Sequence, residues 1–348
     1  MVEWKKLGEV CKVLRGKRVT KGELKENGTY PVISGGVTPM GYIDSFNREP
    51  NTITVSQYGT AGYVDFQQTR FWANDICYSV YPEKDLDNKF LWYALKSQQN
   101  LLYAIRNTDA TPYSLPADTL NSVPIPIPSL EEQTRIVGIL DTFTSAIDNL
   151  KEQIAQRRKQ YEYYRDQLLD LEGKEGVEMK TLGSFAEIGT GSSNTQDELE
   201  NGKYPFFVRS QVVRWKNEYE FDETAVITSG DGVGVGKVLH YYEGKYALHQ
   251  RAYRIKVHVD YVVTKYLFYF MQKDFYSYIM LNAYAASVTS VRKPMLINYP
   301  IPIPSLSEQQ RIVSILDTFE ASISNLEAQL KEREKQYEYY RNKLLTFE

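Results

Sequence analysis

Apolar and aromatic residues recur at alternating intervals of four and three along two stretches of the chain. In the first stretch these positions are Ile136, Leu140, Phe143, Ile147, Leu150, Ile154, Arg157, Tyr161, Tyr164, Leu168 and Leu171. In the second they are Ile312, Leu316, Phe319, Ile323, Leu326, Leu330, Arg333, Tyr337, Tyr340, Leu344 and Phe347. This sustained heptad pattern predicts two coiled-coil helices. Each would extend over roughly 60 Å, too far to bury its seam against a small domain alone. We therefore expect the helices to pack against each other.

Arg157 and Arg333 interrupt the two seams at the same heptad position. In the simpler interpretation, each aliphatic stem covers the seam while the guanidinium group reaches solvent or an acidic neighbour. The alternative is that these arginines set the register of the helices or contact a partner.

The start of each helix carries recognisable signals. Alternating prolines at 123–128 predict an extended connector, because proline cannot continue a helix. Ser129 then supplies an N-cap, and Glu132 three residues later completes a capping box. Ser305 and Glu308 repeat this arrangement.

The helices belong to a longer repeat. Residues 125–172 and 301–348 align without a gap at a spacing of 176 residues, and 31 of the 48 positions are identical. A period of this length indicates a duplicated module rather than a solenoid. The repeat divides the chain into a first block (1–128), a first spacer helix (129–175), a second block (176–304) and a second spacer helix (305–348).

The two blocks have a mixed, β-rich pattern. Strands are expected within 4–19, 27–36 and 51–66, where β-forming runs alternate with glycine-containing turns. Apolar residues at helical spacing predict a helix over 90–105. The second block follows the same order: Asn27-Gly-Thr-Tyr-Pro, for example, is matched by Asn201-Gly-Lys-Tyr-Pro. We expect one fold in both blocks with diverged loops, which suits a scaffold that presents two different binding surfaces.

The connections predict the direction of the helix pair. The second block joins two helices of equal length, so a parallel pair would require that block to span a whole helix length back. We therefore predict an α+β fold. In it, two similar β-rich domains are separated by two long antiparallel coiled-coil helices with pseudo-two-fold symmetry.

Composition and charge are those of an ordinary globular protein. The 348 residues are 42% hydrophobic and 24% charged, with a net charge of −3 and no apolar run long enough for a membrane span. Each block holds 14 Lys/Arg against 13 Asp/Glu, so the acidic excess lies in the repeated stretches. DNA contact through bulk charge is therefore not expected, but local basic clusters remain available. Two cysteines without a zinc-like spacing indicate a reducing, cytoplasmic compartment.

Motifs for catalysis are not found. The glycine-rich run at 230–236 lacks both the G-x-G-x-x-G spacing and a following Lys-Ser/Thr, so a hairpin is expected there. His240, His249 and His258 have no counterparts in the first block and are interpreted as ordinary strand or surface histidines. No cluster has metal-ligand spacing, and the aromatic motif of an amino-methyltransferase is missing. We expect no catalytic residues and no metal site in this chain.

Basic and polar residues near glycines and aromatics give the better functional signal. Arg, Gln, Asn and Ser suit base edges in the major groove, and Lys suits phosphates. In the first block these residues are Lys17, Arg18, Lys21, Ser34, Gly35, Gln57, Tyr58, Thr60, Arg106 and Tyr113. In the second they are Arg209, Ser210, Gln211, Arg214, Ser229, Asp231, Lys237, Arg292 and Lys293. Any one of them could be simple solvated surface, but together in the loops of matched blocks they predict a face that binds double-stranded DNA.

The pattern P-I-P-S-L-x-E-Q-x-R-I-V-x-I-L-D-x-F…I, written at 125–147 and again at 301–323, resembles the specificity subunits of type I restriction–modification systems. The order of variable block and repeated helix resembles them over the whole chain. The resemblance implies that each block is a target-recognition domain for one half of an asymmetric bipartite DNA site. It also implies that the helices fix the spacer length.

The resemblance implies partners as well. The helices would dock two methyltransferase subunits, which use S-adenosylmethionine to methylate adenine N6, and restriction subunits that use ATP and Mg would join them. This chain itself would be non-catalytic and would need no cofactor. The alternative is a structural protein that oligomerises through its coiled coil without DNA specificity.

Overall fold

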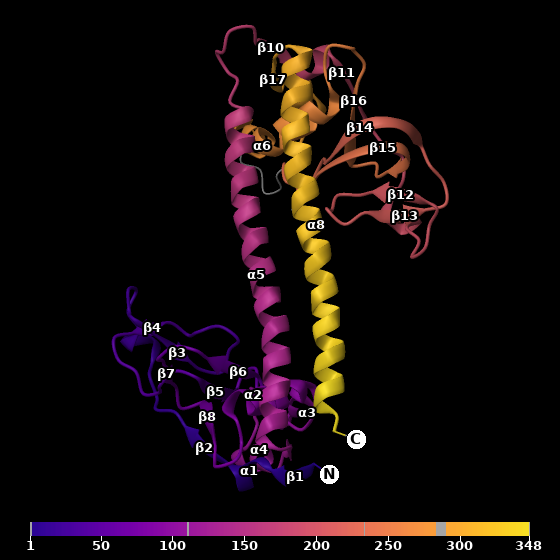
Figure 1. Ribbon diagram of the computed structural model, residues 1–348. Coiled ribbons are helices and arrows are strands. Elements are labelled where there is room, and N and C mark those ends of the chain that lie inside the picture. The colour runs from indigo at the N-terminus through magenta and orange to yellow at the C-terminus, as the bar shows by residue number, and fades with distance from the viewer. Residues whose placement is uncertain (1, 110, 233, 283–289, 348) are drawn as a thin grey trace. The chain divides into compact units, whose positions relative to one another are not determined.

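The computed structural model describes residues 2–109, 111–232, 234–282 and 290–347, which fall into two compact units. The first unit is Met1–Lys151 with Ala328–Glu348, and the second is Glu152–Glu327. Each unit contains one block, the start of one long helix and the end of the other (Figure 1). Val233 of the glycine-rich run and the chain ends Met1 and Glu348 lie outside the described residues.

The first unit is built from short strands that form a four-stranded, a three-stranded and a two-stranded sheet. Its strands are β1 (Glu3–Lys6), β2 (Cys11–Arg15), β3 (Tyr30–Ile33), β4 (Tyr42–Ile43), β5 (Thr52–Ser56), β6 (Val64–Gln67), β7 (Trp72–Ala73), β8 (Cys77–Pro82) and β9 (Pro124–Ile127). Its short helices are α1 (Leu7–Val10), η1 (Lys21–Glu23), α2 (Asn88–Ser97), α3 (Gln99–Ala104) and α4 (Ala117–Asn121). The sheets have the orders β2-β8-β5-β6 and β4-β3-β7, beside the pair β1-β9. Apolar residues of β5, β8 and α2 share one buried cluster, so α2 packs on the four-stranded sheet.

The second unit repeats this topology with longer strands. They are β10 (Glu178–Thr181), β11 (Ala186–Thr190), β12 (Tyr204–Phe207), β13 (Arg214–Lys216), β14 (Phe221–Ser229), β15 (Leu239–Leu248), β16 (Ala252–Val257) and β17 (Pro300–Ile303). The helices are η2 (Leu182–Ser184), η3 (Thr195–Asp197), α6 (Thr264–Asn282) and α7 (Lys293–Ile297). One six-stranded sheet has the order β11-β16-β14-β15-β12-β13, and β10 pairs with β17.

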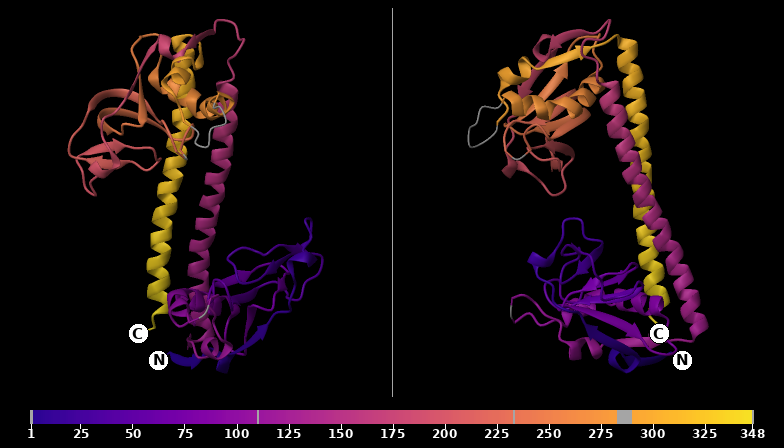
Figure 2. Two further views of the ribbon diagram at one scale, coloured as in Figure 1. Left: turned by 180° about the vertical axis from the view of Figure 1, so that it is seen from behind. Right: turned by 90° about the vertical axis from the view of Figure 1, so that its left-hand side faces the viewer.

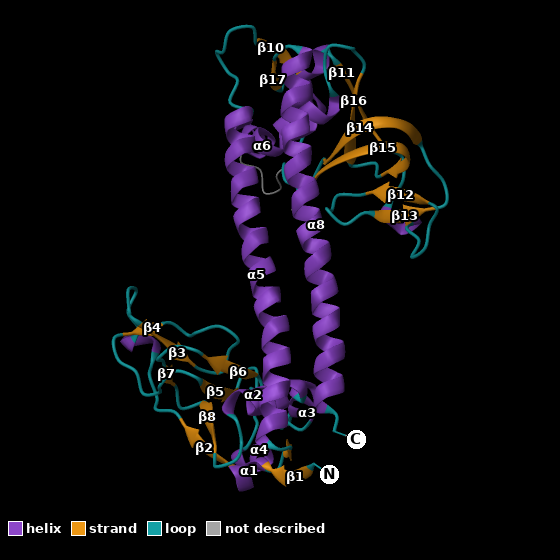
Figure 3. Cartoon of the chain, viewed as in Figure 1, coloured by secondary structure: helices purple, strands orange, loops and turns teal. Residues whose placement is uncertain are grey.

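The expectation of one fold in both blocks is confirmed. In the second unit, β15 pairs antiparallel with β14 along most of its length and parallel with β12 at its end. In the first unit two separate strands make these pairings: β6 pairs antiparallel with β5, and β7 pairs parallel with β3. In both units the strands lie beside the two long helices (Figure 3). The main difference between the blocks is therefore one continuous strand in place of two short ones.

Two predicted elements are interrupted. The strand expected within 4–19 is broken by α1, because Leu7 turns into the core and its N–H donates to the carbonyl of Val123 at 2.8 Å. The helix expected over 90–105 divides at Gln98 into α2 and α3. The reason is Gln99, whose amide accepts from the N–H of Val64 at 3.0 Å and donates to the carbonyl of Gly62 at 2.6 Å.

The proline run is extended, as predicted, but it is a strand rather than a simple connector. β9 pairs antiparallel with β1, and β17 pairs in the same way with β10. Proline cannot donate a hydrogen bond, so alternation leaves only the isoleucine N–H groups for the partner strand. This agrees with a ladder of just two strands, because the other edge of the proline strand has no neighbouring strand to which N–H groups must donate.

The two long helices are α5 (Leu130–Leu168) and α8 (Leu306–Leu345). Ser129 and Ser305 cap them as predicted, each accepting a hydrogen bond at 3.3 Å from the N–H of Glu132 or Glu308. The reciprocal half of the capping box is not what forms. Glu132 instead binds Arg135 one turn further along, and Glu308 binds Arg311, since a bidentate arginine pair is the stronger interaction.

Within each unit the two helices lie side by side and run in opposite directions (Figure 2). In the first unit, Phe143 near the start of α5 stacks on Tyr340 near the end of α8, with ring centroids 5.2 Å apart. In the second, Tyr164 near the end of α5 stacks on Phe319 near the start of α8 at 5.5 Å. The predicted antiparallel direction is confirmed in both units.

The seam is not buried by the partner helix alone. Ile136 and Leu140 are fully buried in the core of the first block, and Ile312 and Leu316 occupy the same position in the second. The start of each helix is therefore part of a domain core. Further along, Ile147 and Ile154 are buried, whereas Leu150, Ile323, Leu326 and Leu330 are only half-buried.

Polar contacts flank the middle of the seam. Lys151 pairs with Glu334 at 3.7 Å in the first unit, and Arg158 pairs with Glu327 at 2.5 Å in the second. Position 151 of the first copy corresponds to position 327 of the second, and position 158 corresponds to 334. In both pairs a basic residue of the first copy meets a glutamate of the second, so both pairs are attractive. Arg157 and Arg333 bind Gln160 and Gln336 within their own helices, at 3.2 and 2.9 Å.

Among the described residues, no helix is long and apolar enough to cross a membrane.

Candidate nucleic-acid interface

In the first unit, the loops after β3, between β5 and β6, and between β7 and β8 meet at one end of the strands. The N–H of Thr60 donates to the carbonyl of Gly35 at 2.8 Å, and the N–H of Gln57 donates to the carbonyl of Ile76 at 2.9 Å. A Cβ atom at Gly35 would lie 2.3 Å from the carbonyl oxygen of Tyr58. Only glycine therefore permits this approach of two loops.

A cationic aromatic cluster extends this loop end. The guanidinium carbon of Arg106, after α3, lies 4.6 Å from the ring centroid of Tyr113 and 5.4 Å from that of Tyr103. The Nε atom of Arg106 is buried and has no hydrogen-bond partner among the described residues. Tyr113 is exposed. Stacked guanidinium and phenol groups of this kind suit both phosphate and base contacts.

The second unit brings its corresponding loops together with charged side chains. Arg209, after β12, donates from Nη1 to Asp231 at 2.7 Å, and Arg251, between β15 and β16, donates to the same carboxylate at 3.1 Å. Ser229 donates from its hydroxyl to the carbonyl of Asp231 at 2.8 Å. The ammonium group of the exposed Lys237 lies 4.8 Å from the ring centroid of Tyr276. The glycine-rich run thus forms a loop that joins β14 to β15, as predicted.

The charge of Asp231 is stabilised by these arginines. Its partial burial acts to raise the pKa, but the hydrogen bonds and charges of Arg209 and Arg251 outweigh that effect and hold the pKa of Asp231 below its usual range. The carboxylate is therefore ionised at neutral pH. Burial lowers the pKa of His249 in the neighbouring turn, and the charge of Arg209 lowers it further.

The predicted interface residues fall into three groups by position. Those at the loop ends are Tyr58, Thr60, Arg106, Tyr113, Arg209, Asp231 and Lys237, with Ser210 and Gln211 directly after Arg209. Exposed basic residues away from these contacts are Lys17, Arg18, Lys21, Arg214, Arg292 and Lys293. Buried residues are Ser34, Gly35, Gln57 and Ser229.

Some of the exposed basic residues away from the loop ends have partners nearby. Arg214 lies on β13 and pairs with Glu198 at 2.8 Å. The backbone of Lys17 donates to the carbonyl of Ala73 at 2.9 Å and accepts from the indole of Trp72 at 2.7 Å, which leaves the ammonium group exposed. Arg292 precedes α7 and Lys293 begins it.

Two residues that support the loops were not predicted. Asn74, 4% exposed, accepts from the N–H of Val19 at 2.9 Å and donates to the Ser34 hydroxyl at 3.3 Å. His249, 2% exposed, stands at the equivalent place and accepts from the N–H of Arg251 at 3.0 Å. His249 is thus not a surface residue: it lies buried directly after β15, where it bridges Ser193, which agrees with the strand half of its interpretation. Asparagine and histidine share no local pattern, so the sequence gives no signal for this equivalence.

A second set of contacts, also not predicted, fastens each block to the start of its helix. Gln133 and Gln309 are completely buried. The Gln133 amide accepts from the N–H of Asp87 at 2.7 Å and donates to the carbonyls of Asp85 and Pro128 at 3.1 and 2.9 Å. Gln309 makes the equivalent bonds to residues 261, 263 and 304 at 2.9 Å each.

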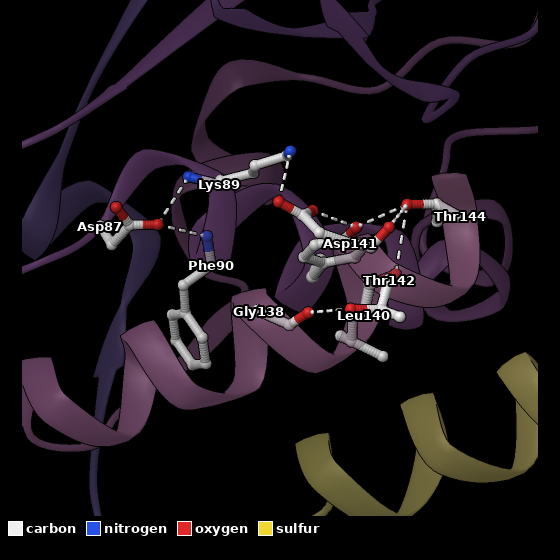
Figure 4. Close-up of polar contacts among 9 residues, drawn as sticks. Asp87, Lys89, Phe90, Gly138, Leu140, Asp141, Thr142 and Thr144 are labelled. Carbon is white, nitrogen blue, oxygen red and sulfur yellow. Dashed lines mark hydrogen bonds and ion pairs between the residues drawn. The ribbon is translucent and has the colours of Figure 1, made fainter. Parts of the chain in front are cut away.

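About two turns further along the helix, charged groups complete the attachment. Lys89 pairs with Asp141 at 2.7 Å (Figure 4). The Tyr93 hydroxyl donates to the same carboxylate at 2.7 Å and lies 3.2 Å from the Thr144 hydroxyl. The same arrangement recurs 176 residues later in the chain, with Lys265, Tyr269 and Asp317. Burial raises the pKa of Tyr93 and Tyr269, so these hydroxyls remain protonated donors. The repeat spacing of these residues was the signal that could have identified them.

The polar and charged groups of these sites suit hydrogen bonding to a partner. Among the described residues, no group of three or more His, Cys, Asp or Glu side chains could hold a metal ion. The loop ends instead carry guanidinium, ammonium, amide and phenol groups on a scaffold of short strands.

Comparison with known proteins agrees with this arrangement. The model of a family described as type I restriction modification DNA specificity domain matches residues 1–157 and 174–335. The EcoR124I/EcoR124II specificity subunit of Escherichia coli is 30% identical over 397 residues, covering 99% of this chain and 94% of that protein.

Two solved structures share the fold. The crystal structure of a type I restriction–modification S subunit from M. genitalium superposes with a TM-score of 0.76 at 21% identity, covering 99% of this chain and 96% of that one. A chain from a study of the assembly and conformational transition of the type I system has a TM-score of 0.57 at 18% identity, with 99% and 97% covered. The family match spans most of the chain, and the resemblance drawn from the repeated signature is confirmed: the chain belongs to the type I restriction modification DNA specificity family.

Proposed function

We propose that this chain selects the DNA sequence on which a type I restriction–modification complex acts. Residues 1–128 read one half of an asymmetric bipartite site, and residues 176–304 read the other. The spacer helices, within 129–175 and 305–348, fix the distance between the halves. The observation that carries the proposal is the pair of blocks with one topology and different side chains at corresponding loop ends.

The attachment of each block to its helix supports the role of the helices. Gln133 and Gln309 make the same buried hydrogen bonds in both units, and Asp141 and Asp317 make the same pairs with lysine and tyrosine. A buried, fully bonded polar network holds one geometry, because any displacement leaves groups without partners. Each reading face is therefore fixed in direction relative to the helix start that carries it.

The chain acts without catalysis of its own. Two methyltransferase subunits, with S-adenosylmethionine, methylate adenine N6 after flipping the base out of the duplex. Restriction subunits, with ATP and Mg, join them. The E. coli relative is, by its name, the specificity subunit of a restriction enzyme, which supports this division of labour. We place the complex in the cytoplasm.

A repeated exposed segment supports docking of the same partner twice. The sequence KQYEYYR occupies 159–165 and again 335–341 without a change, although only five of the fifteen preceding positions match. Packing explains Tyr161 and Tyr164, which contact the opposite helix or its block. It does not explain Tyr163 and Tyr339, which are 59% and 61% exposed. A binding surface kept identical in both copies fits two identical methyltransferase subunits.

Sequencing of N6-methyladenine in cells that carry the complete system tests this function. The proposal predicts one motif with two unlike, defined halves separated by a spacer of constant length. Deletion of this chain, with the methyltransferase kept, is the control and should abolish methylation at that motif. A continuous or palindromic motif, or methylation that persists after the deletion, would contradict the proposal.

A further inference from the structure

The loop ends of the two blocks can be matched position by position. The N–H of Gln57 donates to the carbonyl of Ile76, and the N–H of Gly230 donates to the carbonyl of Arg251. Tyr58 forms an isolated bridge with Ser114, and Asp231 forms one with Ser290. Tyr58 therefore corresponds to Asp231, and Ile76 to Arg251.

The third position follows from the parallel strand pairs. Asn74 donates its N–H to the carbonyl of Ile33, and His249 donates to that of Phe207. Two residues beyond these acceptors stand Gly35 in the first block and Arg209 in the second. The same place in the fold thus holds Gly35, Tyr58 and Ile76 in one block and Arg209, Asp231 and Arg251 in the other.

We infer that Asp231 is a positioning residue that holds Arg209 and Arg251 for base recognition, so that the half-site read by the second block contains a guanine. The inference deepens the proposed function and rests on it. Asp231 itself is an acceptor and would repel phosphate, so it suits a supporting role better than direct DNA contact.

The geometry leaves the arginines free to bind. Each guanidinium group gives Asp231 one N–H of its five, and the side chains of Arg209 and Arg251 are 40% and 62% exposed, against 22% for Asp231. Guanine presents O6 and N7 in the major groove, which a planar guanidinium group binds with two parallel hydrogen bonds. Fixing that group in advance reduces the entropy lost on binding.

The loop itself is built to hold this arrangement. A Cβ atom at Gly230 would lie 2.6 Å from the carbonyl oxygen of Arg251, and one at Gly234 would lie 2.9 Å from that of Arg209. Both glycines let the loop of Asp231 approach the two arginine loops closely. The first block has no charged group at its three matching positions, as expected if it reads different bases.

Methylome sequencing of Asp231→Asn in the intact complex tests the inference. The variant keeps the shape of the side chain but loses its charge. One guanine position of the second half-site should become degenerate, with discrimination reduced roughly 5- to 150-fold. The first half-site and the spacer should not change. Arg209→Ala should relax the same position, and the double variant should add little to either single change.

Asp222→Asn provides the matched control, because Asp222 is exposed on β14 of the same domain. Assembly of each variant with the methyltransferase is measured in parallel, and Arg209→Ala, at an exposed side chain, gives an independent reading if Asp231→Asn assembles poorly. The inference is overturned if both variants keep the motif. It is also overturned if they weaken methylation equally at all sites with a smaller salt dependence, which indicates phosphate contact. If the wild-type system shows no bipartite motif, the proposed function fails instead.

Discussion

Single side chains decide how each block is fixed to its helix. Gln133 and Gln309 are buried amides in which both the oxygen and the nitrogen are bonded to backbone groups of the neighbouring block. Their role at the residue scale is to satisfy backbone donors and acceptors at the partly buried junction between helix and block. Removing such a side chain leaves several buried groups unpaired, and each unpaired group costs about 1–3 kcal/mol.

We predict that Gln133→Ala lowers the free energy of unfolding of the first unit by about 2–4 kcal/mol, since a fully buried side chain is removed and one donor and two acceptors lose their partner. Gln309→Ala should have a similar effect on the second unit. Equilibrium urea unfolding, followed by tyrosine fluorescence, measures both. Gln156→Ala is the control: this exposed glutamine bonds only to Glu152 in its own helix, and the change should stay within about 0.5 kcal/mol. Equal stability of Gln133→Ala and the control would refute this assignment.

Much of the element scale was predictable from the sequence. Heptad spacing predicted the helices, and Ser129 and Ser305 predicted where they begin, because these signals are local and repeated. The connection through the second block predicted their antiparallel direction. The breaks at Leu7 and Gln98 were not predictable. They depend on contacts with Val123 and Gly62, which lie far away in the chain.

The same limit applies to the candidate interface. Composition and glycine positions indicated which loops carry basic and polar groups. The meeting of Asp231 with Arg209 and Arg251 was not visible, because those partners lie 22 and 20 residues away and no local pattern links them. Nor could the sequence separate the buried Ser34 and Ser229 from exposed members of the predicted set.

The repeated segment KQYEYYR yields the prediction that belongs to the helices. Tyr163→Ser should remove one of two bound methyltransferase subunits, or weaken it roughly tenfold or more, because exposed aromatics often dominate an interface. Tyr339→Ser should affect the other, and the double variant should affect both. Native mass spectrometry of the complex measures the stoichiometry.

Gln156→Ser and Glu332→Ser are the matched controls, since they change exposed positions at which the two copies already differ. They should leave two subunits bound. Unchanged binding in the double tyrosine variant would remove this surface from the proposal, and equal loss in the controls would show that any exposed change has the same effect.

At the scale of the whole molecule, the chain consists of one module written twice and altered at the loop ends that we propose contact DNA. The fold, the helix caps, the buried glutamines and the lysine–aspartate–tyrosine contacts recur in both units. The loop ends do not recur: one holds a close contact of glycine and tyrosine, and the other holds two arginines on an aspartate. Duplication thus preserves the means of attachment while each reading surface is free to change.

Exchange of one block tests this account most directly. Residues 1–128 are replaced by the first block of another family member, the repeated helices are kept, and the methylated motif is sequenced. The account predicts that one half of the motif changes, while the other half and the spacer length stay as they were. A motif in which both halves change, or neither does, would contradict it.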